Sequence, residues 1–189
     1  MKKLFMAFAL ALAIVGCTSE NNRYVIEGVL FGGGKFEGER IYLVPFDNGS
    51  AARIDSAVVH DGFFRFEGQT DSSEVFILRM RPMMRLFIEE LLIVREPGHI
   101  HTVLNRSSSV AGTPLNDSLH RWKLYKAHND SILSSWHRRM RTHNTDSVER
   151  IILKYKSDSL RQSMLEYNKE RVAYNRDNAF GALVNRFTH

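Results

Sequence analysis

Two histidines, His99 and His101, are spaced in a way that suits metal binding. They lie two residues apart in "HIHTVLN", a stretch that predicts a β-strand. Successive side chains of a strand point to opposite faces, so both imidazoles are expected on one face, as a metal-binding pair would be. Further ligands would have to come from Glu89, Glu90 or Glu96 on a neighbouring strand. The favoured interpretation is a solvent-facing pair beside a turn, and we expect neither a metal nor another cofactor.

Asp55, Ser56 and His60 are the three residue types of a hydrolase triad, and they fall within six positions. On one strand, however, Asp55 and Ser56 face opposite sides, and triads are assembled from separate elements. The sequence also lacks the G-x-S-x-G motif that exposes a serine nucleophile. We therefore expect Asp55 and Ser56 to bond turn and edge backbone groups near the hairpin at Gly62, and we expect the chain not to be an enzyme.

The only cysteine, Cys17, follows the features of an export signal. Lys2 and Lys3 begin the chain, an apolar run covers residues 4–15, and a small residue, Gly16, precedes the cysteine. The run is shorter than the stretch of about 20 apolar residues that spans a bilayer. The order "IVGC" resembles the bacterial lipobox, in which the thiol receives a diacylglycerol and the new amine is usually acylated.

The lipobox predicts a lipoprotein signal peptide over residues 1–16 and a linker over residues 17–23. The thiol of Cys17 would then be a thioether, which leaves no free thiol and no disulfide. Several acyl chains make such an anchor effectively permanent. We expect a cell-envelope protein held by lipid, most favourably at the outer membrane, with its body on the periplasmic or surface face. The alternative is an ordinary secretory leader with an incidental cysteine.

Residues 24–112 show the pattern of an antiparallel all-β domain, in which short apolar runs are separated by turn signals. The clearest local feature is "IDSAVVHDGFFRFEG". Its two alternating runs, 54–60 and 63–67, flank Asp61-Gly62, which predicts a β-hairpin because these turn residues tolerate positive φ. About seven strands at this spacing favour a sandwich or a small open barrel.

Several aromatic side chains near the glycine-rich stretch "FGGGKF" are candidates for ligand contact. A sandwich with exposed aromatic residues can bind sugars or peptides, but most of these side chains are more simply core residues. The residues are Phe31, Phe36, Tyr42 and Phe46.

Residues 113–189 predict a helical hairpin with a short third helix. Thr113 is a suitable N-cap with Pro114 at the first helical position, and the first helix is expected to end near Arg141. Its apolar residues fall on one stripe: Leu115, Leu119, Trp122, Leu133, Trp136 and Met140.

The second helix is expected from Ser147 to about Tyr174, because Asp146 followed by Glu149 resembles a capping box. The stretch "DNAFGALVNRF" predicts the third helix. The apolar side of the second helix comprises Leu153, Leu160, Met164, Tyr167 and Tyr174.

The two halves of the chain differ in charge. Residues 17–112 hold 10 basic and 13 acidic side chains, whereas residues 113–189 hold 14 and 8. The favoured interpretation of the basic half is a solvated helix surface; the functional one is attraction to an anionic partner or a lipid surface. Nucleic acid is not an expected partner of an exported lipoprotein.

The motifs of the β domain resemble the uncharacterised domain that stands N-terminal to thioredoxin-like domains in many bacterial lipoproteins. The similarity is carried by "VIEGVLFGG", "RIYLVP", "LLIVREPGHIHTVL" and "VAGTPLNDSL". It covers Tyr24 to about Trp122. Its most specific block runs from Ile54 to Gly68, where the matching positions are Asp55, Ser56, Gly62, Phe64, Phe66 and Gly68.

In that family a helical segment leads into a thioredoxin domain with a Cys-x-x-Cys pair. This sequence stops at His189 and has one cysteine, so we expect the redox activity to be missing. The main expectation is a non-catalytic binding or scaffolding protein, anchored by lipid, whose helical hairpin contacts a partner protein. The alternatives are a truncated or stand-alone relative of a thioredoxin-like oxidoreductase lipoprotein that acts beside a redox partner, and a sandwich that binds a sugar or a peptide.

Overall fold

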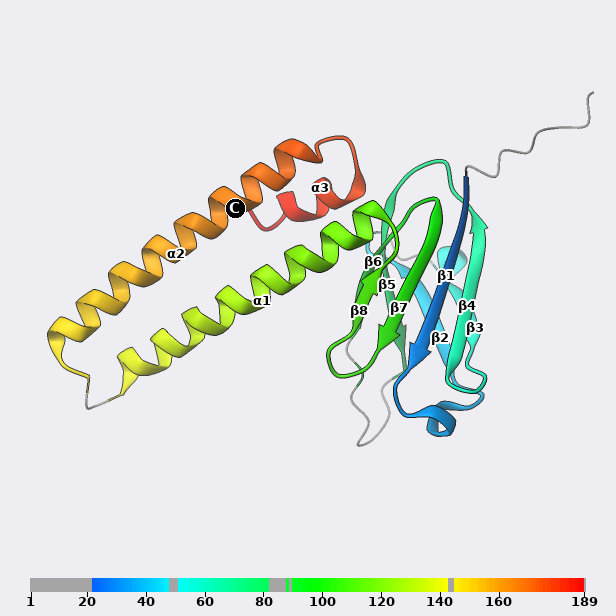
Figure 1. Cartoon of the computed structure of the whole chain (residues 1–189), viewed down its shortest axis with the longest axis horizontal. Coiled ribbons are helices and arrows are strands. Elements are labelled where there is room, and N and C mark those ends of the chain that lie inside the picture. Colours follow the sequence, from blue (N-terminus) through cyan, green and yellow to red (C-terminus); the bar gives the residue numbers. More distant parts are fainter. Residues whose placement is uncertain (1–21, 48–50, 82–87, 89, 143–144, 189) are drawn as a thin grey trace, which may run out of the picture.

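The chain folds into a two-sheet β-sandwich followed by three helices (Figure 1). The computed structural model describes residues 22–47, 51–81, 88, 90–142 and 145–188. The fold class expected from the sequence, a β-sandwich followed by a helical hairpin, is confirmed. The leader, Cys17 and the first residues of the linker lie outside the described residues.

One sheet has the strand order β4-β1-β7-β8 and the other β3-β2-β5-β6. We call them sheet A and sheet B. The strands of sheet A are β1 (Arg23–Leu30), β4 (Phe63–Gln69), β7 (Gly98–Leu104) and β8 (Ser109–Ala111). The strands of sheet B are β2 (Arg40–Pro45), β3 (Asp55–Val58), β5 (Glu74–Met80) and β6 (Leu91–Arg95).

One pair of strands departs from the expected antiparallel arrangement. β1 and β7 run parallel, with Tyr24 opposite Gly98 and Leu30 opposite Leu104. Parallel neighbours need a long connection, and here all four strands of sheet B lie between β1 and β7 in the sequence. The stretch "SVA", which carried no strand signal, adds β8 as the edge of sheet A.

The turn expected at Asp61-Gly62 is present, but the strands on its two sides do not pair with each other as a hairpin would require. Both residues have positive φ, 51° and 79°, as such a turn requires. A bridge between His60 and Phe63 closes it. Beyond this bridge the two runs separate, because β3 pairs with β2 in sheet B and β4 pairs with β1 in sheet A. The turn therefore carries the chain from one sheet to the other.

The main core lies between the two sheets. Alternate residues of β1 and β4 face it, among them Ile26, Leu30, Phe64 and Phe66. A second cluster lies on the outer face of β5 and β6, where the helices pack, so these strands are buried on both faces. Its buried members are Val75, Val94, Leu119, Trp122, Phe180, Leu183 and Val184.

The helices are α1 (Pro114–Arg141), α2 (Ser147–Tyr174) and α3 (Ala179–Asn185). The bounds expected for the two long helices are confirmed, and the third helix lies inside the expected stretch 177–187 but is shorter. α1 and α2 form a long hairpin that projects from the sandwich, while α3 packs where the hairpin meets sheet B (Figure 1). The rings of Tyr125 and Tyr167 stack at 4.0 Å between the two long helices. Tyr174 was expected on the packed side of α2, but it is 87% exposed, so that assignment is wrong.

Caps at the start of both long helices follow the sequence signals, with one difference. The Asp146 carboxylate accepts a hydrogen bond from the Glu149 backbone N–H, as a capping residue should. Thr113 occupies the N-cap position of α1, but its hydroxyl accepts a hydrogen bond from the Asn116 side chain instead. The backbone N–H groups of Leu115 and Asn116 donate to Glu96 Oε1, at 2.8 and 3.2 Å.

Across the part of the chain that the structure describes, none of the helices combines the length and the apolar character needed to cross a bilayer.

Candidate functional site

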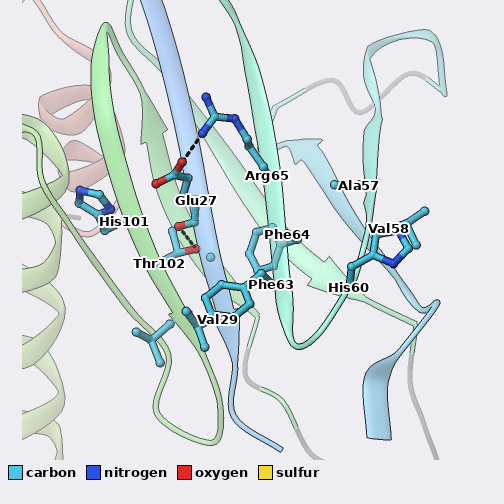
Figure 2. Close-up of a pocket in the computed structure, with 12 residues that line it drawn as sticks. Glu27, Val29, Ala57, Val58, His60, Phe63, Phe64, Arg65, His101 and Thr102 are labelled. Carbon is cyan, nitrogen blue, oxygen red and sulfur yellow. Dashed lines mark hydrogen bonds and ion pairs between the residues drawn. The ribbon is translucent and has the colours of Figure 1, made fainter. Parts of the chain in front are cut away.

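A hollow of about 800 Å³ opens on the outer face of sheet A (Figure 2). Its walls come from β1, β4 and β7 and from the end of β3. Because strand pairs are in register, the outward side chains of sheet A form rows across the strands. Two of these rows supply half of the residues that line the hollow.

The first row is apolar. Val29 lies opposite Phe63 on one side and Val103 on the other. Figure 2 shows Val29 beside Phe63, which comes from the neighbouring strand. The side chain of Phe63 is 60% exposed, and Val29 is also exposed. Apolar residues on an outward face that could hold polar ones indicate a contact surface rather than a solvated sheet.

The second row is charged and lies directly beside the first. Glu27 is opposite Arg65 and His101. The Glu27 carboxylate and the Arg65 guanidinium form an ion pair, and they point toward each other in Figure 2. Arg65 also pairs with Glu67, 3.1 Å away, on the far side from the apolar row. The hydrogen bond from Arg23, and then that from Arg65, holds the pKa of Glu67 below its usual value. The apolar row is thus bounded on one side by the ion pair of Glu27 and Arg65.

Gly28 lies between the two rows, and its backbone forms part of the wall. On the core side of this residue, the ring of Phe64 occupies the space that a side chain would fill. A Cβ at Gly28 would lie 2.0 Å from Phe64 Cζ and 2.5 Å from Thr102 Oγ1. At this point only the backbone of residue 28 separates the hollow from the core. The position requires glycine because any side chain would overlap Phe64 and Thr102.

Gly28→Ala is expected to lower the free energy of unfolding by about 2 kcal/mol, because Phe64 is buried and has to shift to admit the methyl group. Urea unfolding followed by circular dichroism measures the change. Gly34→Ala is the matched control, since nothing lies within 4 Å of its Cβ position. Equal free energies of unfolding for the two variants would contradict the close contact between position 28 and the ring of Phe64.

His60 lies at the rim of the hollow where the chain crosses between the sheets. Its Nδ1 is 3.0 Å from Glu37 Oε1, and the Asp61 backbone N–H donates to the other oxygen of Glu37 at 2.7 Å. The hydrogen bond from Asp61, followed by that from His60, lowers the pKa of Glu37. Glu37 thus fixes the turn that leads into Phe63.

The residues with triad chemistry are not brought together. The Asp55 carboxylate accepts from the adjacent Ser56 N–H, and the Ser56 hydroxyl accepts from Arg40 at 3.1 Å. His60 contacts Glu37, as described above. Asp55 bonds a backbone group, as the structural interpretation expected, whereas the Ser56 hydroxyl bonds a side chain of the neighbouring strand β2.

The two candidate metal ligands are separated by the edge of the hollow. His99 and His101 are both exposed on the same face of β7, as the strand period predicts, and only His101 lines the hollow. Of the carboxylates considered with them, Glu96 is engaged by the start of α1. Among the residues that the structure describes, no three His, Cys, Asp or Glu side chains are grouped to hold a metal ion.

The aromatic candidates fall into different environments. Phe36 is buried in the core, Tyr42 and Phe46 are half-buried, and Phe31 is 77% exposed. Phe31 directly follows β1, and its backbone N–H bonds to Leu104 O at 3.1 Å. The sequence pattern indicates Phe31 as a candidate but does not reveal the apolar row. The available signal was the apolar character of outward positions 29, 63 and 103.

Comparison with known proteins identifies a family but no characterised relative. Residues 24–119 match the family described as a domain of unknown function (DUF4369), slightly more than half of the 189 residues. No curated protein and no solved structure matches the chain. Apart from Arg23, the match includes the strands that the structure describes, together with the hollow and the first residues of α1. The chain therefore belongs to the DUF4369 family.

Proposed function

We propose that this protein is a non-catalytic binding protein of the cell envelope, anchored by lipid on Cys17, whose sandwich holds an apolar segment of an extended peptide. The observation that carries the binding role is the exposed apolar row of Val29, Phe63 and Val103 at the bottom of a hollow. A hollow of about 800 Å³ has the size that ligand sites commonly have.

The free edge of β4 supports a peptide as the ligand. β4 is the first strand of sheet A, with β1 as its partner on one side. Phe63 N and O bond to His60, away from β1. Because backbone groups alternate along a strand, those of Arg65 and Glu67 also point to the free edge. An extended peptide can add to such an edge as a further strand, with its side chains in neighbouring pockets.

A peptide fits the hollow better than a sugar does. Sugar recognition needs polar groups that are available to hydroxyls, and here Glu27 and Arg65 are paired with each other. The remaining wall offers mainly aliphatic and aromatic carbon. An apolar peptide side chain would cover Phe63 and Val29 and remove their surface from water, at about 25 cal/mol for each Å².

The envelope location and the lipid anchor rest on the sequence around Cys17, namely the basic start, the apolar run and "IVGC". A second role follows from the family resemblance stated above. The domain resembles the part that precedes thioredoxin-like domains, and this chain would then act beside a separate oxidoreductase. Copurification with a thioredoxin-like protein, lost on Phe63→Ser, would favour this role and place the partner in the hollow.

Phe63→Ser is expected to weaken peptide binding at least tenfold, because it removes the largest exposed apolar side chain of the row. The probe is a library of random heptapeptides displayed on phage, selected on the wild-type chain and resynthesised for titration. We expect apolar, β-prone peptides to be enriched. Leu124→Ser, which removes an exposed apolar side chain from α1, is the control and should leave binding unchanged.

The same proteins applied to a glycan array distinguish the two ligand classes. Glycan binding that is lost on Phe63→Ser would replace the peptide by a sugar. Failure to enrich any peptide, or equal affinity of wild type and Phe63→Ser, would overturn the binding role of the hollow.

A further inference from the structure

The first turns of α2 carry four exposed apolar side chains on one side of the helix. Val148, Ile151, Ile152 and Tyr155 have the spacing i, i+3, i+4 and i+7, which places them in a single stripe. Ile151 is 69% and Tyr155 76% exposed. We call these four residues the tip face. An amphipathic helix normally turns such a stripe toward a partner.

The tip face points away from the rest of the chain. Contacts between the long helices are made by other positions of α2: Glu149 pairs with Arg139 at 2.8 Å, and Arg161 lies 2.8 Å from His137. At 100° per residue these two positions lie more than 100° from the centre of the tip face, one on each side of it. Ser157, the buried residue of α2, lies almost directly opposite the tip face. Figure 1 also shows that this end of the hairpin is far from the sandwich. Packing among the residues that the structure describes therefore leaves the tip face uncovered.

The surroundings of the tip face are strongly basic. Within the described residues between 138 and 156, six side chains are Lys or Arg and two are Asp or Glu. Lys154 and Lys156 follow the stripe on its two sides, about 100° from its centre. Both are exposed, and neither forms an ion pair with a residue that the structure describes. A short apolar stripe flanked by lysines is typical of helices that lie in a membrane interface.

We propose that the tip face binds the surface of an anionic phospholipid bilayer. Its apolar side chains would enter the region below the headgroups, and Lys154 and Lys156 would contact lipid phosphates. Tyr155 suits this boundary because its ring is apolar and its hydroxyl polar. The interaction is separate from the hollow and does not require lipid on Cys17.

A second copy of the chain is a poorer occupant of the same surface. Two tips in contact would bring together two groups of six cationic side chains, which repel. The stripe also becomes polar further along α2, at Ser159, Gln162 and Glu166. A long pair of helices would need apolar residues there.

A fluorophore on the tip tests the proposal directly. In the full chain carrying Cys17→Ser, Ile152→Cys supplies the only thiol, which is labelled with an environment-sensitive nitrobenzoxadiazole group. Vesicles of phosphatidylglycerol and phosphatidylcholine in equal parts should shift its emission to shorter wavelength. Brominated lipids should quench it. Lys154→Gln with Lys156→Gln should weaken the response on the order of tenfold, and high salt should do the same.

The control label is at Leu124→Cys, an exposed position on α1, which should not respond. This pair of labels separates insertion of the tip from binding through residues 1–16. No shift at position 152 with anionic vesicles would overturn the proposal, and so would an equal shift with phosphatidylcholine alone. If unlabelled protein, added without vesicles, shifts the emission of the label at position 152, the tip face binds a second copy of the chain instead. Because Cys17 is replaced throughout, the result is independent of the lipid anchor and of peptide binding.

Discussion

Asn116→Ala is expected to lower the free energy of unfolding by about 3 kcal/mol, because it leaves two buried backbone groups without partners. Asn116 is fully buried at the start of α1. Its Oδ1 accepts from the Val94 N–H at 2.8 Å, and its Nδ2 donates to the Val94 carbonyl at 2.7 Å. The side chain thus pairs with β6 as a neighbouring strand would. Urea unfolding followed by circular dichroism measures the loss.

The effect should reach beyond local stability, since Asn116 joins the helical hairpin to the sandwich. Its backbone N–H and that of Leu115 also bond to Glu96, which follows β6. Hydrogen exchange is therefore expected to speed up at the start of α1 and in β6 before the strands of sheet A.

Asn129→Ala is the matched control for Asn116→Ala. Asn129 is also a buried asparagine of α1, but its Nδ2 donates only to the Tyr125 carbonyl within the same helix. Its replacement by alanine should lower the free energy of unfolding by less than about 1 kcal/mol. If both variants lost the same stability, the link between Asn116 and β6 would not hold the two parts together.

The helices could be predicted from the sequence because their signals are local. Thr113-Pro114 and Asp146 mark the starts of α1 and α2, and both helices end where the sequence indicated. Cap residues act within one turn, so no distant contact is needed to recognise them. Even here the acceptor for the backbone N–H of Leu115 is the carboxylate of Glu96, which follows β6 and which no local pattern reveals.

Strand partners could not be predicted in the same way. The turn at Asp61-Gly62 is encoded by residues that accept positive φ, but the turn does not determine which strands pair beyond it. Here the flanking runs join different sheets. The choice depends on burial of Phe64 and Phe66 against β1, which is set by residues about forty positions away.

The candidate site was missed for the same physical reason. Val29, Phe63 and Val103 are far apart in the sequence, and each is an ordinary apolar strand residue on its own. They become one row only through the antiparallel pairing of β1 with β4 and the parallel pairing of β1 with β7. The sequence predicted a sandwich that could bind a ligand, but the parallel pair that forms the row was not expected.

The hollow and the tip face belong to different parts of the chain. The family match ends at residue 119, so it includes the hollow, whereas the tip face begins at Val148 and lies beyond it. A ligand of the hollow is therefore a property to seek in other members of the family. Lipid binding by the tip face is instead a property of this chain's own helices, and the two can be separated by the variants described above.

Cys17→Ala is expected to move most of the protein out of the membrane fraction, because the residue that carries the lipid is removed. Each buried methylene of an acyl chain stabilises membrane attachment by about 0.8 kcal/mol, and one chain alone binds only marginally. Incorporation of labelled palmitate into the wild-type chain, and its loss in the variant, gives a second readout. The chain has no other cysteine to accept a diacylglycerol.

Thr18→Ala, at the neighbouring position, controls for general effects on export and should keep both the label and the membrane location. The tip face adds a reason to measure palmitate as well as fractionation. If the tip binds anionic lipid, some unlipidated protein will remain with membranes at low salt and leave them at high salt, since exposed charges are screened. Membrane retention of Cys17→Ala that persists at high salt, together with a mature wild-type chain whose mass corresponds to a free thiol, would show that Cys17 is not an anchor.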